Sequence, residues 1–160
     1  MVDARRATPE DATELVRLRG LMLAAMAGSD PEPGAWQDLA RDNLRDWLAG
    51  PEPWLAAFVV DAPAGGLAAC AVGTIERRLG GPANPSGLCG YVFNVSTDPA
   101  HRRRGHSRAC MTALLHWFRE RGVRKIDLRA SEAGRPLYRS LGFRETAEPT
   151  MRLTVPADRT

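Results

Sequence analysis

The sequence predicts an α/β protein with a central mixed, mostly antiparallel sheet and helices on both faces. Segments of strand-like composition alternate with segments whose apolar residues recur at helical spacing, in the order β-α-α-β-β-β-α-β-α-β-β. Short stretches rich in Gly and Pro separate these segments. The chain has 160 residues, of which 44% are hydrophobic and 26% charged, as in ordinary globular proteins. We therefore expect residues 1–160 to form a single domain.

The first elements are a short strand over residues 3–6 and a helix that ends near Ala27. Thr8 is placed as the N-cap of this helix and Pro9 as its first residue. The apolar residues of the helix form a Met-rich stripe at helical spacing, which is more often core than ligand site, so we expect it to be core. The stripe consists of Leu15, Leu18, Met22, Leu23 and Met26.

The next segments predict a second helix and a hairpin. Residues 28–34 contain strong helix breakers, and a helix over residues 35–49 follows them. Residues 54–61 are typical of a strand, and a Gly- and Pro-containing turn joins them to a longer strand over residues 67–79. The second of these strands is mostly small and apolar, which indicates burial on both faces.

The remaining elements complete the sheet. The apolar segment 91–97 predicts the fourth strand, and a helix and then a strand over residues 123–130 follow it. Ser131 is a candidate N-cap for the final helix. Residues 143–146 and 150–155 are expected to form two closing strands.

The most informative stretch runs from the fourth strand through a basic loop into the third helix. A turn at Pro99 is followed by residues 102–107, whose sequence is RRRGHS. The first N–H groups of a helix lack internal partners and lie at the positive end of its dipole. Gly105 has no Cβ, so a phosphate can approach the backbone closely. The stretch predicts a small phosphate-bearing ligand, with a solvated basic corner or nucleic-acid phosphates as the alternatives.

Composition and spacing argue against several other classes. The stretch is neither a Walker loop nor the dinucleotide fingerprint, because the required Lys and glycines are missing. The net charge of +3 is mild and comes from clustered arginines, which favours a local anionic ligand over a nucleic-acid surface. No apolar run reaches the length of a membrane span, and the N-terminus carries no targeting pattern. Cys70, Cys89 and Cys110 show no metal spacing, so we expect reduced core thiols in a cytoplasmic protein without a metal.

Two segments resemble motifs of the GNAT superfamily of N-acetyltransferases. Residues 102–107 resemble its acyl-CoA signature Gln/Arg-x-x-Gly-x-Gly/Ala, with Ser107 in place of the last small residue. Residues 97–99 stand where the family usually has Val-x-Pro, and residues 136–143 (PLYRSLGF) resemble its Leu-Tyr-x-x-x-Gly-Phe segment. The two segments occur in the family's order at a typical separation.

The resemblance implies a GNAT-like fold with acetyl-CoA as cosubstrate. The pyrophosphate would be held by N–H groups of residues 103–108, and the pantetheine arm would lie along residues 95–97, between splayed fourth and fifth strands. The first two helices would form one wall of the acceptor site. Ser131 is either a pantetheine contact or a helix cap, and Asn94 is either a bulge residue or an acceptor contact. The candidate cofactor-binding residues are Val95, Ser96, Thr97, Arg102, Arg103, Arg104, Gly105, His106, Ser107, Arg108 and Ser131.

Amine acetylation by direct attack needs a general acid and a base but no enzyme nucleophile. The resemblance makes Tyr138 the candidate acid, because a tyrosine with a pKa of about 10 keeps its proton at neutral pH and can protonate a leaving thiolate. Its alternative role is a core tyrosine. Glu76, Tyr91 and Asp98 are candidate bases, and a water chain is the other possibility.

The resemblance therefore predicts an acetyl-CoA-dependent N-acetyltransferase acting on a primary amine of a small molecule or a protein. The alternative within the same fold is a catalytically silent acyl-CoA-binding sensor. The expected partners are acetyl-CoA and the amine acceptor, with no nucleic acid and no membrane, and the protein is expected to be a monomer or homodimer.

Overall fold

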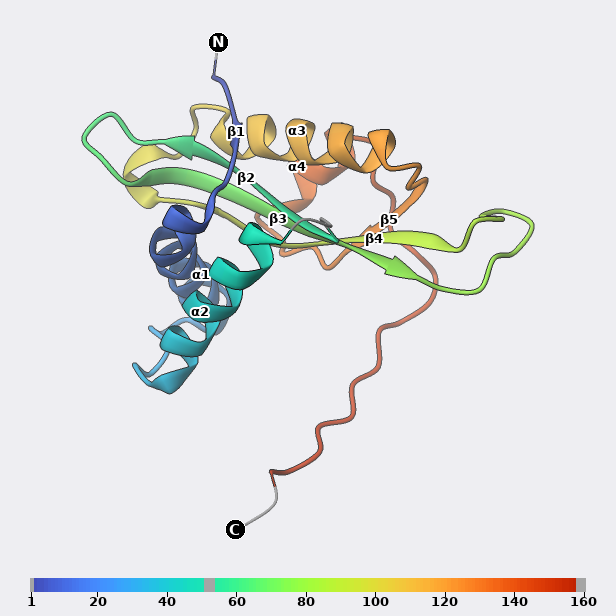
Figure 1. The fold of residues 1–160 in the computed structure, drawn as a ribbon, viewed down its shortest axis with the longest axis horizontal. Coiled ribbons are helices and arrows are strands. Elements are labelled where there is room, and N and C mark those ends of the chain that lie inside the picture. Colours follow the sequence, from blue (N-terminus) through green and yellow to red (C-terminus); the bar gives the residue numbers. More distant parts are fainter. Residues whose placement is uncertain (1, 51–53, 158–160) are drawn as a thin grey trace.

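A five-stranded sheet lies at the centre of the protein (Figure 1). The computed structural model describes residues 2–50 and 54–157. The first three pairings are antiparallel and the last, between the fourth and fifth strands, is parallel, so the predicted mixed and mostly antiparallel sheet is confirmed. The strands, adjacent in chain order, are β1 (Arg5–Arg6), β2 (Leu55–Asp61), β3 (Leu67–Arg77), β4 (Leu88–Thr97) and β5 (Lys125–Leu128).

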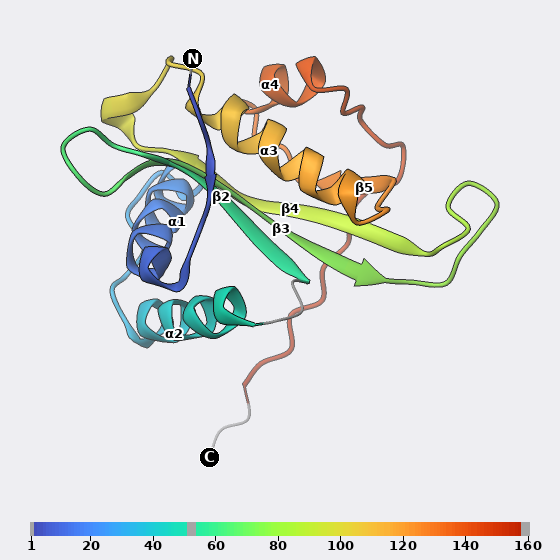
Figure 2. The same cartoon turned by 45° about the horizontal axis from the view of Figure 1, so that its top comes forward.

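Helices cover both faces of the sheet, as predicted (Figure 2). On one face lie α1 (Ala12–Ala27), which follows the single turn η1 (Pro9–Asp11), and α2 (Ala35–Ala49). On the other face lie α3 (His106–Glu120) and the short helix α4 (Arg135–Ser140). A second single turn, η2 (Pro99–His101), connects β4 to the loop before α3.

Each face of the sheet has its own hydrophobic core. On the α3 side Phe118 is fully buried against β3 and β4, where two glycines make room for its ring. A Cβ at Gly73 would lie 2.7 Å from the ring Cζ, and one at Gly90 would lie 2.8 Å from Cε1. On the other side Leu15 and Leu18 of α1 are fully buried against the sheet. The packed cores fix α1 and α3 against opposite faces of β4.

A β-bulge interrupts the pairing of β3 with β4. Val72 faces Phe93, but Cys70 faces Ser96, so two β4 residues oppose one residue of β3. Asn94 occupies the bulge with a φ of 54°. Of the two roles expected for Asn94, the bulge residue is therefore confirmed.

The partner of β4 on its other side ends early. The parallel pairing with β5 stops where Val92 faces Leu128, whereas β4 continues to Thr97. In the described part of the chain, no strand pairs with the outer edge of residues 93–97. The bulge and the end of β5 thus leave half of β4 with an open edge.

The two closing strands predicted over residues 143–146 and 150–155 are wrong. The structure shows irregular chain there, and Met151, Leu153 and Val155 are 90%, 87% and 76% exposed. Alternating apolar residues form a strand only when a neighbouring strand accepts their hydrogen bonds and buries one face. Among the described residues β5 remains the edge of the sheet, so the local preference finds no partner.

An ion-pair network ties α1 to both strands at the open end of the β3–β4 hairpin. Arg17 donates to Glu14 at 2.6 Å, to Asp98 at 2.7 Å and to the carbonyl of Leu67 at 2.9 Å. Glu14 also accepts the N–H of Leu67 at 2.8 Å. The hydrogen bond from Arg17 is the main cause that lowers the pKa of Glu14.

We expect Glu14→Gln to destabilise the protein by about 1 kcal/mol at pH 7, because the charged pair with Arg17 is lost. The pKa of Glu14 is lower in the folded state, so its contribution is present above the unfolded pKa and disappears as pH falls through the folded pKa. Urea unfolding at pH 7, 5 and 3 measures this. Asp38→Asn, at an exposed pair on α2, is the control. A deficit of Glu14→Gln that did not shrink between pH 7 and pH 3 would contradict the prediction.

Candidate active site

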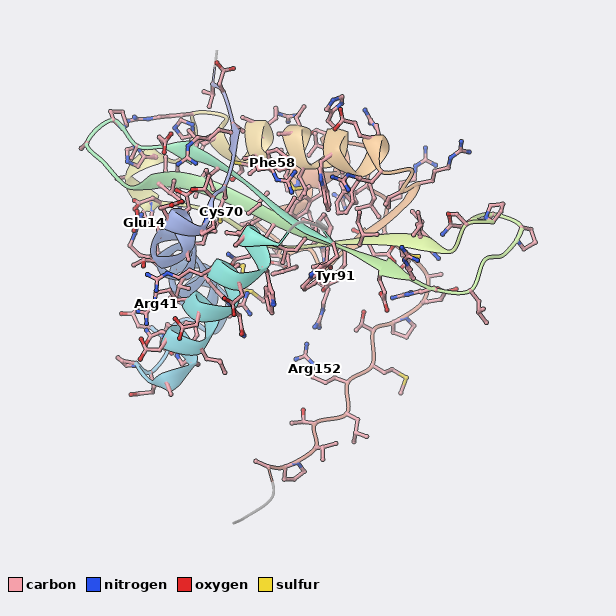
Figure 3. All side chains as sticks on the ribbon, viewed as in Figure 1. Glu14, Arg41, Phe58, Cys70, Tyr91 and Arg152 are labelled. Atoms are coloured by element: carbon pink, nitrogen blue, oxygen red, sulfur yellow. The ribbon has the colours of Figure 1, made fainter. Side chains whose placement is uncertain are left out.

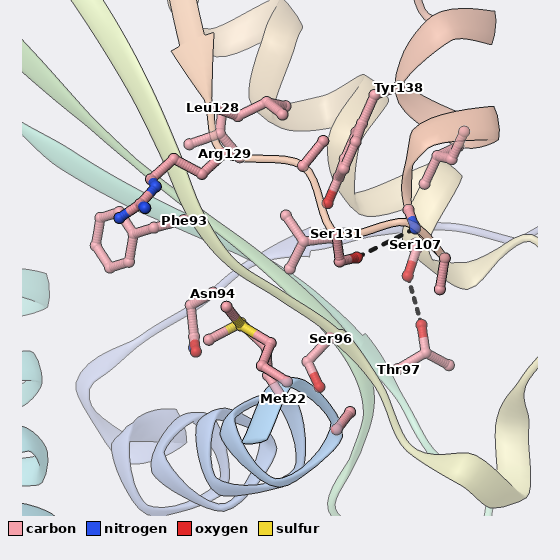
Figure 4. Close-up of a pocket in the computed structure, with 18 of the residues that line it drawn as sticks. Met22, Phe93, Asn94, Ser96, Thr97, Ser107, Leu128, Arg129, Ser131 and Tyr138 are labelled. Atoms are coloured by element: carbon pink, nitrogen blue, oxygen red, sulfur yellow. Dashed lines mark hydrogen bonds between the residues drawn. The ribbon is translucent and has the colours of Figure 1, made fainter. Parts of the chain in front are cut away.

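A cleft of about 1430 Å³ runs along the open edge of β4 (Figure 4). Its floor is the second half of β4, and its walls come from α1, from the basic loop with the start of α3, and from residues 128–138. Arg152 of the C-terminal segment also lines it. The cleft therefore brings together both segments that carry the family resemblance.

The basic loop presents its backbone to the cleft. Arg103 and Gly105 have φ values of 62° and 78°, in the left-handed region, and Gly105 is the N-cap of α3. A Cβ at Gly105 would meet no atom within 4 Å. Among the described residues, no backbone acceptor takes the N–H groups of residues 103–108. These groups and the positive end of the α3 dipole form a site suited to an anion.

Ser107 has a structural use at the start of α3. Its hydroxyl forms a short hydrogen bond with the Thr97 hydroxyl at the end of β4 (Figure 4). This bond holds the end of β4 against the first turn of α3. The next residue, Arg108, donates to Ser140 Oγ at 2.7 Å and joins α3 to α4. The serine that replaces the family's small residue is thus accommodated by a local partner.

The side chains of the basic loop differ in position. Arg102, Arg103 and Arg108 line the cleft, whereas Arg104 does not. His106 also lines it and lies 6.2 Å from His101, centroid to centroid. Burial, followed by the neighbouring His101 and Arg104, lowers the pKa of His106, so it is neutral at pH 7.

The open half of β4 forms the floor between the loop and the bulge. Val95, Ser96 and Thr97 all line the cleft, and their other edge pairs with β3. Asn94 lines it too and is 4% exposed. The structure thus places the predicted pantetheine-binding edge beside the loop, with no described strand on its outer side.

Tyr138 lies across the cleft from β4 with its hydroxyl directed inward (Figure 4). The residue is 9% exposed, and its ring packs edge-on against Phe143 at 6.1 Å between centroids. Gly134 admits the ring, because a Cβ there would lie 2.7 Å from Cε2. Burial raises the pKa of Tyr138, so the phenol is protonated at neutral pH. The arrangement suits a proton donor.

Ser131 lines the cleft and also caps a turn. Its Oγ accepts the N–H of Gly134 at 3.2 Å, and α4 begins only at Arg135. The hydroxyl stabilises the turn before the helix rather than the first turn of the helix itself. Its proton remains available to a ligand in the cleft.

The candidate bases are dispersed. Tyr91 lines the cleft, and its ring stacks on Phe93 at 6.4 Å. Glu76 does not line the cleft. It faces Cys89, and the cleft-lining part of β4 begins only at Tyr91. The Glu76 carboxylate instead accepts a hydrogen bond from Arg78 at 2.9 Å. A base must lie within hydrogen-bond reach of the proton that it removes, so this placement argues against Glu76.

Asp98 is also occupied within the protein. Its carboxylate accepts from Arg17 at 2.7 Å and from the N–H of Ala100 at 2.9 Å, and it is not among the cleft-lining residues. The Ala100 N–H and Arg17 lower its pKa. It therefore acts as a cap and ion-pair partner in the turn after β4.

The prediction that the Met-rich stripe of α1 belongs to the core is wrong for its second half. Leu15 and Leu18 are buried, but Met22, Leu23 and Met26 line the cleft. The available signal was Arg19, a charged residue four positions after Leu15 and three before Met22, on the apolar stripe itself. Of the two helices expected to form a wall, only α1 contributes described lining residues. Phe93, Arg129 and Arg152 are further lining residues that sequence reasoning missed.

The structure gives little support to other chemistries. All three cysteines are buried and free, none lines the cleft, and burial raises the pKa of Cys110 to about 12. Among the described residues, no group of three or more His, Cys, Asp or Glu side chains is placed to hold a metal ion. None of the described helices combines the length and the apolar character that crossing a bilayer requires.

Comparison with known proteins identifies the family. The sequence-family model described as "Acetyltransferase (GNAT) family" matches residues 23–143 of this chain. A mycothiol acetyltransferase of Thermomonospora curvata is 32% identical over 144 residues, which are 88% of this chain and 43% of that protein. This chain thus spans less than half the length of that relative.

Solved structures agree with this result. A predicted acetyltransferase of Clostridium acetobutylicum, solved with acetyl-CoA, is 27% identical with a TM-score of 0.81 over 96% of both chains. A GCN5-related N-acetyltransferase of Ralstonia eutropha JMP134 is 26% identical with a TM-score of 0.74 over 96% of this chain and 99% of that one. The chain therefore belongs to the GNAT family of acetyltransferases.

Proposed function

We propose that the protein is an enzyme that transfers an acetyl group from acetyl-CoA to a primary amine by direct attack within a ternary complex. One observation carries the proposal. A loop with unsatisfied N–H groups, an open strand edge and the inward-directed hydroxyl of Tyr138 all border one cleft. The likeness to an acetyltransferase solved with acetyl-CoA supports the choice of cosubstrate.

The residues present fit acetyl-CoA. The N–H groups of residues 103–108 match the oxygens of a diphosphate, and Arg102 and Arg103 add charge beside them. The outer edge of residues 95–97 offers backbone groups to the amides of a pantetheine arm, in the manner of an added strand. When bound there, acetyl-CoA supplies the activated acetyl thioester, and the protein fixes its position along β4.

Tyr138 is proposed as the general acid. As the amine nitrogen bonds to the carbonyl carbon and the carbon–sulfur bond breaks, the phenol gives its proton to the leaving sulfur. The burial that raises the pKa of Tyr138 keeps this proton in place until then. The proton that the amine releases to solvent restores the phenol, so the step is balanced.

The amine is proposed to lose its proton to water. Glu132 is the sole carboxylate among the described residues of the cleft lining, and it lies in an exposed turn. The lining is otherwise rich in arginine, which disfavours an ammonium ion and so assists deprotonation. No dedicated protein base is then required.

The test is the amine-dependent release of free thiol from acetyl-CoA by the purified protein, with mass spectrometry of the product. We expect release above the hydrolysis background, and kcat/KM that rises with pH until the pKa of the amine used. If the rise of kcat/KM with pH had the same midpoint for amines of different pKa, and disappeared in Tyr91→Phe, Tyr91 would be the base. Calorimetric binding of acetyl-CoA without thiol release from any amine would instead indicate a sensor, and absence of binding would refute the proposal.

A further inference from the structure

Three arginines line the cleft outside the basic loop, namely Arg19, Arg129 and Arg152. We propose that they select an acceptor whose amine is accompanied by an anionic group, a carboxylate or a phosphate. The acceptor class is thus an amino acid or an amino-phosphate compound, rather than a polyamine or an aminoglycoside. This inference rests on the proposed function, because it concerns the second substrate of the same cleft.

The position of these arginines follows from the register of the sheet. Arg129 comes directly after Leu128, which faces Val92, so it emerges where β5 leaves β4. Phe93, Arg129 and Arg19 all line the cleft. Arg19 comes from α1, and its Nη1 lies 3.5 Å from the Oδ1 of Asn94, the bulge residue. Two different elements, α1 and the segment after β5, therefore contribute guanidinium groups to the cleft.

Arg152 comes from the C-terminal segment. Figure 3 shows this segment on the same side of the sheet as α1, and Tyr91 and Arg152 both line the cleft. Three separate parts of the chain thus bring positive charge to the cleft outside the basic loop.

This part of the cleft is separate from the anion-binding loop. A strand rises about 3.3 Å per residue, so Phe93 lies about 13 Å along β4 from Thr97, whose hydroxyl contacts Ser107 of the loop. In the view of Figure 4 the Tyr138 hydroxyl lies between Arg129 and the Thr97–Ser107 pair. The proposed acid therefore divides the cleft into a cofactor end and an arginine end, and the latter is where an acceptor must enter.

Several arginines outside the cleft are neutralised by carboxylates. Arg5 pairs with Asp11 and Asp61, Arg17 with Glu14 and Asp98, and Arg139 with Glu145. Within residues 2–50 and 54–157, no carboxylate lies within 4.0 Å of a nitrogen of the three cleft arginines. Glu132 is the sole acidic side chain of the described lining.

Unpaired guanidinium groups in a partly enclosed space attract anions, because they offer planar forks of donors and the local field is not neutralised. The same charges repel a polycation. An amine with a nearby carboxylate or phosphate is therefore the acceptor whose charge balances that of the cleft arginines.

The test compares acceptors that differ in one anionic group. Leucine is paired with leucinamide, and glucosamine 6-phosphate with glucosamine; spermidine and kanamycin serve as polycations. We expect kcat/KM for thiol release to be at least tenfold higher for the anionic member of at least one pair. The pair with the larger ratio shows whether the preferred anionic group is a carboxylate or a phosphate. Leucinamide is the less basic amine of its pair, so a preference for leucine cannot come from a larger neutral fraction. A preference for the neutral members or the polycations would overturn the inference.

Variants locate the preference. Arg19→Gln and Arg129→Gln are each expected to reduce the anionic preference about tenfold through the KM of the acceptor, with the KM of acetyl-CoA unchanged. Arg45→Gln is the control, because Arg45 lies on α2, away from the lining, with only an exposed partner, Asp42, at 3.9 Å. An equal fall in kcat for both members of a pair would place the arginines at the reacting carbonyl and overturn their role in selection.

A binding measurement separates this inference from the proposed function. Leucine and leucinamide are titrated by calorimetry into the protein saturated with CoA, which requires no turnover. Tighter binding of leucine supports the inference even when no thiol is released, a result that refutes the proposed function alone. Thiol release without any preference in the pairs refutes the inference alone.

Discussion

Replacing Tyr138 by phenylalanine is expected to lower kcat for acetyl transfer by about 10²- to 10³-fold, in the range attributed to one general acid. The affinity for acetyl-CoA is expected to stay the same, because the groups assigned to the cofactor lie on β4 and in the basic loop. The change removes one oxygen from a ring whose packing against Phe143 and Gly134 is retained. Stopped-flow or steady-state thiol release gives kcat, and calorimetry gives the affinity.

The control for this substitution is the stability of the fold. Among the described residues, the Tyr138 hydroxyl makes no hydrogen bond within the protein, so the midpoint of thermal unfolding should not fall. An unchanged kcat would exclude Tyr138 as the acid and return it to the role of a core tyrosine. A fall in both kcat and stability would indicate a general structural defect.

Replacing Gly105 by valine is expected to weaken acetyl-CoA binding by about 10- to 100-fold, which corresponds to about 1.4–2.7 kcal/mol. The φ of 78° at this position is strongly disfavoured for a β-branched residue. The loop must therefore leave the conformation in which its N–H groups are free of backbone acceptors. Calorimetry at modest ionic strength measures the loss.

Gly122→Val is a matched control on the same helix. Gly122 follows the C-terminal end of α3 with a φ of 74°, and a Cβ there would meet no atom within 4 Å, as at Gly105. Both variants should lose a similar stability, about 1–2 kcal/mol. Only Gly105→Val should lose affinity for acetyl-CoA. Equal affinities of the two variants would argue against backbone binding of the diphosphate.

The sequence predicted those elements whose signal is local. The N-cap and Pro at the start of the first helix, the breakers after Ala27 and the Gly- and Pro-containing turn between β2 and β3 all lie where the structure shows boundaries. The basic loop was found because a helix start with a preceding glycine is a local pattern as well. Tyr138 was a candidate only through the family motif, since its burial and direction depend on Gly134 and Phe143.

The failures concern features that depend on distant parts of the chain. The alternation of residues 150–155 favours a strand, but local preference does not supply a neighbour. The apolar residues of α1 keep the same helical spacing from Leu15 to Met26, but only Leu15 and Leu18 pack in the core, and the second half of the helix borders the cleft. Glu76 had suitable chemistry, but the antiparallel register places it outside the cleft.

The bulge at Asn94 has a consequence for how the protein can change over time. On one side of it the cosubstrate is expected to meet mainchain atoms, which almost every amino acid supplies alike. On the other side the acceptor is expected to meet arginine and methionine side chains from α1, the segment after β5 and the C-terminal segment. Single substitutions can therefore redirect the choice of amine while the machinery for thioester use is inherited intact.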